Sequence, residues 1–398
     1  MGALVLFFVV LLAVAFFTRL DLFFYLFYAL AGIYLLGRGW AKRSLAAVVL
    51  ARKHEQRVFL GETFPVEVEI YNSSLLPVLW MRLYDSVPAN LGAGSAFRHI
   101  LSLLPHERLK LAYNLTGKRR GYYPIGPMVT QGGDLLGTAT YEHRYLHDDF
   151  VIVYPKIVTL RNLGFSSHSP FGTLPGRERL FEDPSRILGV RDYQSGDSLR
   201  KMDWKTSARL NSLQIRRYEP AIALETAVFL NLAAVDYVLE RRREATELGI
   251  VVAASLAVHL GKQRQAVGLV SNGRDPLAES AGTVPSLPLR KGREHVMNVL
   301  DLLARIEVAS EEDHPIPFLE LVSRKSLRLP WGSTAVLVTA KEVDGLMRAL
   351  LALRRRGLLV LLVLTCPHRE FESTAQRAEQ IGVQTVRVWT EKDLDVWR

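Results

Sequence analysis

Two long uncharged stretches at the N-terminus restrict the fold of this chain most strongly. Met1 to Phe17 and Leu22 to Gly37 carry no charged side chain, and only Thr18 to Asp21 lies between them. As a helix, each stretch spans roughly 25 Å, slightly less than the ~30 Å hydrocarbon core of a bilayer. Aromatic residues such as Trp40 suit the membrane–water interface. We therefore predict a transmembrane helical hairpin over residues 1–40.

A cleaved signal peptide is the alternative interpretation of this region. Signal peptides have a basic segment before the apolar one and a small-residue cleavage motif after it. Here only the terminal amine precedes the first apolar stretch, and a second apolar stretch follows almost at once. These two features favour the hairpin.

Basic residues after the second stretch predict the orientation. Residues 41–57 read as a basic juxtamembrane segment, and the basic side chains near the second stretch are Arg38, Lys42, Arg43, Arg52, Lys53 and Arg57. The positive-inside rule places both termini and the soluble domains in the cytoplasm, anchored to the cell membrane. The cluster is either simply solvated or also attracted to anionic lipid. A single cysteine, Cys366, fits a reducing compartment and excludes an intramolecular disulfide.

Residues 58–165 change to an alternation of apolar and polar side chains. The pattern predicts strands at Phe64–Ile70, Val78–Tyr84, Leu109–Leu115 and Val151–Pro155. Several short strands without a long helical pattern are typical of an antiparallel sandwich. We therefore expect a β-rich domain, of a kind that usually binds or spaces other parts.

The connector at residues 166–220 contains the densest mixture of Arg, Asp, Tyr and Trp, from Gly189 to Pro220. Asp197 or Ser198 is the expected cap of a short helix that starts at Leu199 and ends at Asn211. Arg200 and Asp203 have the spacing of an ion pair on that helix. Leu213 to Tyr218 then alternates as a strand.

Three interpretations of this connector remain open. Its arginines can form bidentate hydrogen bonds with carboxylates and so hold two domains together. Trp204, Tyr193 and the arginines can instead anchor a protein partner. A phosphate or nucleic-acid surface is the third reading, although the chain has neither a glycine-rich phosphate loop nor a recognised nucleic-acid motif.

Residues 221–398 alternate strand and helix patterns. Strands are predicted from about Ala227, Gln265, Thr334, Leu358 and Gln384, and helices over 236–262, 293–305, 343–355 and 372–380. Asp236 is the expected cap of the first helix. This alternation predicts an α/β doubly wound, largely parallel sheet. Ligands of such sheets bind beyond the carboxyl ends of the strands.

In this order, the pieces resemble the bacterial domain of unknown function 58 family over nearly the whole chain. Tyr193 to Arg209 is similar to the family signature, Arg216 to Glu219 to its continuation, and Arg120–Pro127, Asp134–Gly137 and Val153–Pro155 to the middle region. The residues expected to bind a partner or join domains are Arg191, Asp192, Tyr193, Gly196, Asp197, Arg200, Asp203, Trp204, Ala208 and Arg209.

The resemblance implies a multi-domain, non-enzymatic membrane protein whose last domain is von Willebrand factor A-like. Relatives are commonly encoded with MoxR-type AAA+ ATPases, and sometimes with transglutaminase-like membrane proteins. The von Willebrand-like domain would contact the ATPase. No cofactor is expected.

One departure from full von Willebrand A domains concerns their divalent-cation site. That site needs an Asp-x-Ser-x-Ser motif after the first strand, because a hard cation requires several oxygen ligands. This chain has Asn231, Ala233 and Val235 at those places, and Thr339 and Ala340 after a later strand. We therefore predict that the metal site is lost.

The leading hypothesis is a membrane-anchored cytoplasmic scaffold that docks a MoxR-type ATPase or its client. The alternative is nucleic-acid or anionic-lipid binding through the formal net charge of +10. A hydrolase is less favoured, because the chain has no GxSxG, HExxH or P-loop motif. His143 and His147 are four residues apart but lie in a strand-like segment, which favours a surface pair over a metal site.

Overall fold

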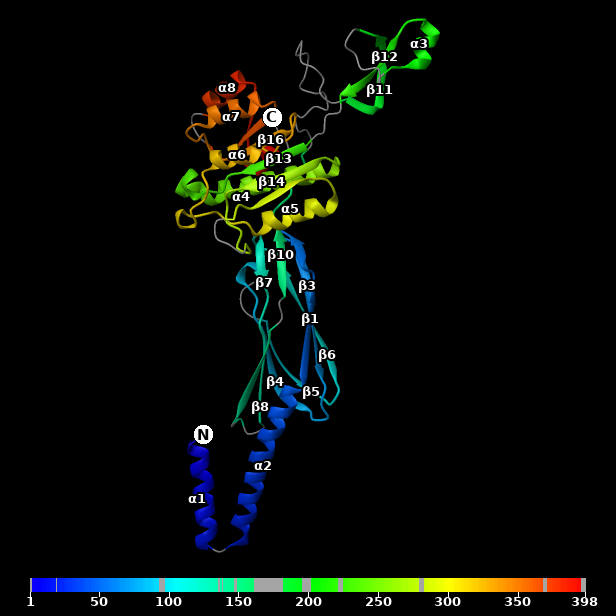
Figure 1. Cartoon of the computed structure of the whole chain (residues 1–398). Coiled ribbons are helices and arrows are strands. Elements are labelled where there is room, and N and C mark those ends of the chain that lie inside the picture. Colours follow the sequence, from blue (N-terminus) through cyan, green and yellow to red (C-terminus); the bar gives the residue numbers. More distant parts are fainter. Residues whose placement is uncertain are drawn as a thin grey trace. The chain divides into compact units, whose positions relative to one another are not determined.

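The computed structural model divides the chain into two compact units, Met1–Lys156 and Ile157–Arg398, which are described separately (Figure 1). It describes residues 2–18, 20–92, 97–134, 137, 139–146, 149–160, 182–194, 202–220, 225–278, 283–367 and 371–394.

Two apolar helices begin the first unit, as expected. The first, α1, spans Gly2–Thr18, and α2 spans Asp21–Ala46. They pack side by side, and the Phe8 ring lies 5.9 Å from that of Phe27 and 5.7 Å from that of Tyr34. By length and composition α2 could cross a membrane, a test that the mostly buried helix α4 also passes. The second helix extends beyond residue 40 because Ala41, Ser44 and Leu45 are buried.

The β-rich part of the first unit contains three small sheets. Their orders are β1-β3-β6, β5-β4-β8-β9 and β2-β10-β7, antiparallel except for the pair β2 and β10. The strands are β1 Val48–His54, β2 Arg57–Phe59, β3 Thr63–Asn72, β4 Val78–Asp85, β5 Phe97–Leu103, β6 Arg108–Thr116, β7 Gly121–Pro124, β8 Met128–Gly133, β9 Thr140–Tyr145 and β10 Phe150–Tyr154. The strands expected from alternation fall within β3, β4, β6 and β10.

The predicted juxtamembrane segment 41–57 needs correction. It contains the end of α2, all of β1 and the start of β2, so the β-rich part begins at Val48 rather than at residue 58. Arg52, expected among solvated basic residues, is buried between strands. Its guanidinium pairs with the carboxylate of Asp85, and its Nη1 donates to Asp149 Oδ2 at 2.7 Å and to the carbonyl oxygen of Ile125 at 3.1 Å. Only the folded chain brings these two acids to Arg52, since neither is near it in sequence.

A β-hairpin with one short helix opens the described part of the connector. β11 (Glu182–Asp192) pairs antiparallel with β12 (Gln214–Pro220), and α3 spans Trp204–Leu210. The expected helix end at Asn211 is confirmed, because that residue has a left-handed backbone with φ of 53°. The observed helix begins at Trp204 with Asp203 as its cap. The caps expected at Asp197 or Ser198 lie outside the described residues.

A six-stranded sheet forms the centre of the last domain, in the order β15-β14-β13-β16-β17-β18. All neighbours are parallel except β15, which pairs antiparallel with β14. The strands are β13 Glu225–Leu230, β14 Ala266–Ser271, β15 Ser286–Arg290, β16 Thr334–Thr339, β17 Leu359–Leu364 and β18 Gln384–Arg387. The expected alternation of strands and helices is therefore present, with β15 as an addition.

Helices cover both faces of this sheet (Figure 1). They are α4 Arg242–Lys262, α5 Arg293–Arg305, α6 Phe318–Ser326, α7 Leu346–Arg355 and α8 Phe371–Gln380. Phe318, Leu350 and Ala378 from α6, α7 and α8 share one core with Phe229 and Leu337 of the sheet. The pattern of α4 is nearly all apolar from Ile250 to Ala257, and those residues are buried. Its start differs from the prediction, because α4 begins at Arg242 and Asp236 does not cap it.

Candidate functional site

Asn231 lies directly after β13, at the carboxyl end of that strand, and is the first of the positions considered above for a divalent-cation site. The side chain is fully buried. Its amide nitrogen Nδ2 donates to Asp236 Oδ2 at 2.8 Å and to Thr339 Oγ1 at 3.1 Å. Its Oδ1 accepts from Asn272 Nδ2 at 3.1 Å and from the backbone N–H of Ala233 at 3.2 Å. All four hydrogen-bonding positions of the amide are therefore used.

This arrangement does not fit a divalent cation. The Asn231 amide nitrogen lies between the Asp236 carboxylate and the Thr339 hydroxyl, the two oxygens that a cation there would draw together. A metal needs oxygen donors, and an N–H group directed at the same place repels it. Ala233 and exposed Val235 contribute no side-chain oxygen. Among the described residues no three His, Cys, Asp or Glu side chains gather to hold a metal ion.

Two further side chains close the space beneath Asn231. The Tyr237 hydroxyl donates to the Asn231 carbonyl oxygen at 2.5 Å, and burial together with the Asp236 charge raises the pKa of Tyr237. Cys366 packs in the same small cluster, and burial raises the pKa of its thiol. A thiol held in its neutral form is a weak nucleophile. The Tyr237 hydrogen bond holds the loop after β13 against the end of that strand.

The rim around this filled position is partly apolar. Val235 is 67% exposed and faces an open groove of about 300 Å³ that is also lined by Ala309, Ser310, Glu311, His314 and Pro315. Val238 and Leu239 of the same loop are exposed as well. The groove at the carboxyl edge of the sheet thus combines apolar side chains with the polar side chains of Ser310, Glu311 and His314.

Asp203 organises the hairpin formed by β11, α3 and β12, here named the signature hairpin. Its Oδ1 accepts from the backbone N–H of Thr206 at 3.0 Å, and its Oδ2 accepts from Arg216 Nε at 3.0 Å. These contacts, the Thr206 one foremost, lower the pKa of the Asp203 carboxyl. Buried Ser207 adds a bridge: its hydroxyl donates to the Asp203 carbonyl at 2.7 Å and accepts from the Gln214 N–H at 2.8 Å. The sequence predicts an ion pair between Arg200 and Asp203. Arg200 lies outside the described residues, and the observed partner of Asp203 is Arg216.

Other signature residues divide between structural and exposed positions. Asp192 accepts from Gln214 Nε2, the Tyr193 N–H donates to the Leu213 carbonyl at 2.9 Å, and Arg191 Nη1 donates to the Asp192 carbonyl at 3.1 Å. The first two contacts join the two sides of the hairpin, whereas the Arg191 contact lies within β11. By contrast, Trp204 is 67% exposed, and Ala208 and Arg209 on the same helix are exposed too. Gly196 and Asp197 lie outside the described residues.

Three apolar side chains that the sequence prediction did not single out accompany Trp204 on the hairpin. They are Leu210, Leu213 and Val190, and each is exposed. A two-stranded hairpin is marginally stable alone, because it has too little core. No sequence signal identified these residues, because short apolar runs look the same whether covered or exposed.

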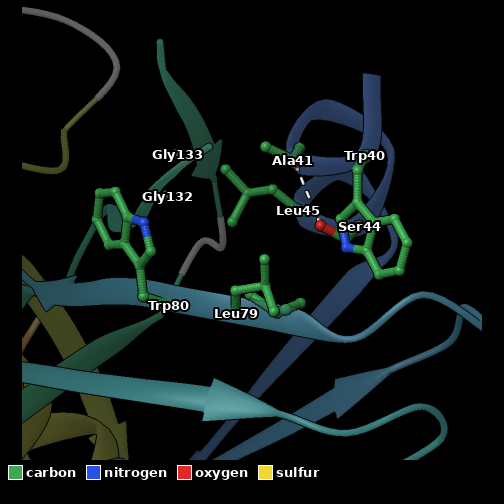
Figure 2. Close-up of a pocket in the computed structure, with 9 residues that line it drawn as sticks. Trp40, Ala41, Ser44, Leu45, Leu79, Trp80, Gly132 and Gly133 are labelled. Carbon is green, nitrogen blue, oxygen red and sulfur yellow. Dashed lines mark hydrogen bonds between the residues drawn. The ribbon is translucent and has the colours of Figure 1, made fainter. Parts of the chain in front are cut away.

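A tightly packed joint connects α2 to the β-rich part (Figure 2). Trp40, Ser44 and Leu45 of α2 face Leu79 and Trp80 of β4, beside two glycines of β8. The cavity between them is only about 10 Å³, too small for a ligand. A Cβ added to Gly132 would lie 3.2 Å from the Leu45 side chain, so the missing side chain allows the close approach.

Of the two histidines considered above as a metal-ligand pair, His143 lies exposed in β9, and His147 is outside the described residues.

Residues 189–381 match the family model described as "Protein of unknown function DUF58". The match starts in the signature hairpin and ends just after α8. The chain is also 23% identical over 286 residues to the uncharacterized protein YeaD of Bacillus subtilis, which covers 70% of this chain and 68% of YeaD.

Solved structures resemble only a part of the chain. The CARDB domain of the PF1109 protein from Pyrococcus furiosus is 21% identical, with 27% of this chain and 91% of that chain covered at a TM-score of 0.20. Spo0M from Bacillus subtilis is 13% identical, with 27% of this chain and 49% of that chain covered at a TM-score of 0.17. Likeness of this size supports no argument about fold or ligand.

Proposed function

We propose that this protein is a membrane-anchored cytoplasmic adaptor that holds a MoxR-type AAA+ ATPase, or a client of that ATPase, at the cell membrane. The hairpin of α1 and α2 would be the anchor. The last domain would be von Willebrand factor A-like, which is supported by its strand order and by the antiparallel edge strand β15. The proposed role involves binding and no catalytic step.

The exposed Trp204 is the observation that carries this proposal. It lies within the matched region, on an element with little core of its own. Exposed tryptophans with arginine neighbours are typical anchors of protein interfaces. Arg209, on the same helix, adds a charge that can pair with an acidic partner.

Partner binding would proceed without a bridging cation. In a domain with a complete cation site, a metal bridges to a carboxylate of the partner. Here the Asn231 amide uses its hydrogen bonds within the protein. Recognition would then rest on side chains of the hairpin and on the apolar rim around Val235.

The test is binding of the full chain, reconstituted in nanodiscs, to a purified MoxR-type ATPase from the same organism. Trp204→Ala should weaken binding by about tenfold or more, because anchor residues contribute about 2 kcal/mol or more. Arg209→Glu should weaken it as well. Trp331→Ala removes another exposed tryptophan, outside the hairpin, and should change little. Equal binding by the wild type and Trp204→Ala, with the fold intact by circular dichroism, would refute the proposal.

A further inference from the structure

Exposed leucines gather at the end of the β-rich part where α2 enters it. Leu75 lies in the turn between β3 and β4 and is 79% exposed, and Leu104 lies in the turn between β5 and β6 and is 66% exposed. The two turns touch through buried Asn72, whose Nδ2 donates to the carbonyl oxygens of Leu76 at 2.9 Å and Leu104 at 3.1 Å. The two turns therefore lie side by side, and their exposed leucines are here named the leucine tip.

The leucine tip is tied directly to α2. Trp40 Nε1 donates to the Pro77 carbonyl at 2.9 Å, at the end of the first turn. At the other end of that turn, the Ser73 N–H and hydroxyl donate to the Ala47 carbonyl at 3.1 and 2.7 Å. The backbone N–H of Ser74 also donates a hydrogen bond to Asn72 Oδ1 at 3.1 Å. The turn is therefore held firmly, and its exposed leucine is not a consequence of a loose loop.

Helix length places this tip near the edge of a membrane. From Asp21 to Trp40 the helix rises roughly 30 Å, the thickness of the hydrocarbon core. With Asp21 at one interface, Trp40 reaches the other, where tryptophan is favoured. Lys42 and Arg43 follow immediately and are exposed, where they can meet anionic headgroups.

We propose that the leucine tip rests in the lipid headgroup layer and forms a second contact between this protein and the membrane. Such a contact would fix the tilt of the β-rich part relative to the membrane. Leu45 of α2 already packs into the core of that part. This inference depends on the proposed membrane anchor.

Site-specific quenching by lipid tests the proposal. The single cysteine is first removed as Cys366→Ser, and then Leu75→Cys or Leu104→Cys is labelled with an environment-sensitive fluorophore. The labelled full-length chain is reconstituted in vesicles that contain lipids with a quencher on the acyl chain. Leu60→Cys is the matched control, an exposed leucine beyond the opposite end of β3, roughly 30 Å away along the strand. Ile33→Cys on α2 reports the membrane span itself.

We expect quenching at Leu75 and Leu104 to be several-fold stronger than at Leu60 and weaker than at Ile33. Strong quenching at Ile33, with Leu75 and Leu104 no more quenched than Leu60, would overturn the inference and leave the anchor intact. No quenching at Ile33 would refute the anchor and the inference with it. A blue-shifted label at Leu75 that persists in detergent and is not quenched by lipid would assign the tip to a protein neighbour, which also overturns the inference.

Discussion

At the scale of single residues, Asn231 decides the chemistry of the carboxyl edge of the sheet. Its amide donates toward Asp236 and Thr339 and accepts from Asn272, so one neutral side chain satisfies polar groups from three loops. Buried polar groups are stable only when they are paired in this way. The identity of this residue therefore determines whether the edge holds a cation or a hydrogen-bonded network.

Asn231→Asp should destabilise the protein by about 3 to 5 kcal/mol at neutral pH, because it places a buried carboxylate against the carboxylate of Asp236. Thermal melting by circular dichroism measures the change. Millimolar Mg²⁺ should raise the melting temperature of the variant, in which two carboxylates and Thr339 offer oxygen ligands, and leave the wild type unchanged. A Mg²⁺-dependent rise in the wild type would contradict the conclusion that the amide fills the site.

Arg52 is the corresponding residue of the β-rich part. The Tyr113 hydroxyl donates to Asp85 at 2.6 Å, so Arg52, Asp85 and Tyr113 form one buried network. Burial, with the Asp85 charge, raises the pKa of Tyr113. This network lies where strands of different sheets meet, which explains why an arginine is held there.

Arg52→Met should cost about 3 to 5 kcal/mol in unfolding free energy, since it leaves the buried Asp85 carboxylate without its positive partner. Lys110→Met is the matched control: it breaks an exposed pair with Glu69 at 2.7 Å in the same part of the chain and should cost at most about 1 kcal/mol. Urea unfolding of both variants in detergent compares them. Similar midpoints would mean that the buried network contributes no more than a surface ion pair.

At the scale of elements, the signature hairpin depends on a single carboxylate. Asp203 caps α3 and pairs with Arg216 of β12, so it connects the helix to the strand. The lowered pKa of Asp203 means that its ionised form is favoured by folding. Its contribution to stability is therefore present above the unfolded pKa and is lost as pH falls through the lower folded value.

Hydrogen exchange of the hairpin should show this pH dependence. Protection of β12 is expected to persist at about pH 5 and to fall as the pH drops below the ordinary aspartate pKa of about 4, toward the lower folded value at which Asp203 takes up a proton. Asp203→Asn keeps a capping side chain but carries no charge, so its protection should be lower at pH 5 and change less on acidification. Identical pH profiles for the wild type and Asp203→Asn would show that Asp203 does not cause the pH dependence of protection.

At the scale of the whole molecule, α2 belongs to two environments. Residues up to Trp40 are largely exposed and apolar, whereas Ala41, Ser44 and Leu45 are buried against the β-rich part. A helix that continues into a domain core without a linker transmits its orientation to that domain. The N-terminal hairpin is thus also part of the β-rich fold.

Two truncations should separate these roles. A chain that starts at residue 41 loses the apolar segment but keeps the packed end of α2, and it should fold without detergent. A chain that starts at residue 48 also loses Leu45 from the core, which should cost about 2 to 5 kcal/mol by analogy with deletion of a buried leucine. Comparison of their melting temperatures tests this. Equal stability would mean that α2 is only an anchor.

Local patterns in the sequence were enough to predict the apolar helices, the alternating strands β3, β4, β6 and β10 and most of the α/β elements. Apolar periodicity records which face of an element is buried, and that information is local. Edge strand β15 was missed because Pro288 interrupts a short run. Proline is tolerated there because an edge strand leaves one row of backbone groups unpaired.

The tertiary structure alone decided which polar groups meet. Arg52 has the same sequence appearance as the basic residues around it, and only the approach of Asp85 and Asp149 makes it a buried ion-pair residue. Asp236 follows a strand and looks like a helix cap, yet it accepts from Asn231. A hydrogen bond or ion pair depends on the distance between segments far apart in the chain, and no single segment contains that distance.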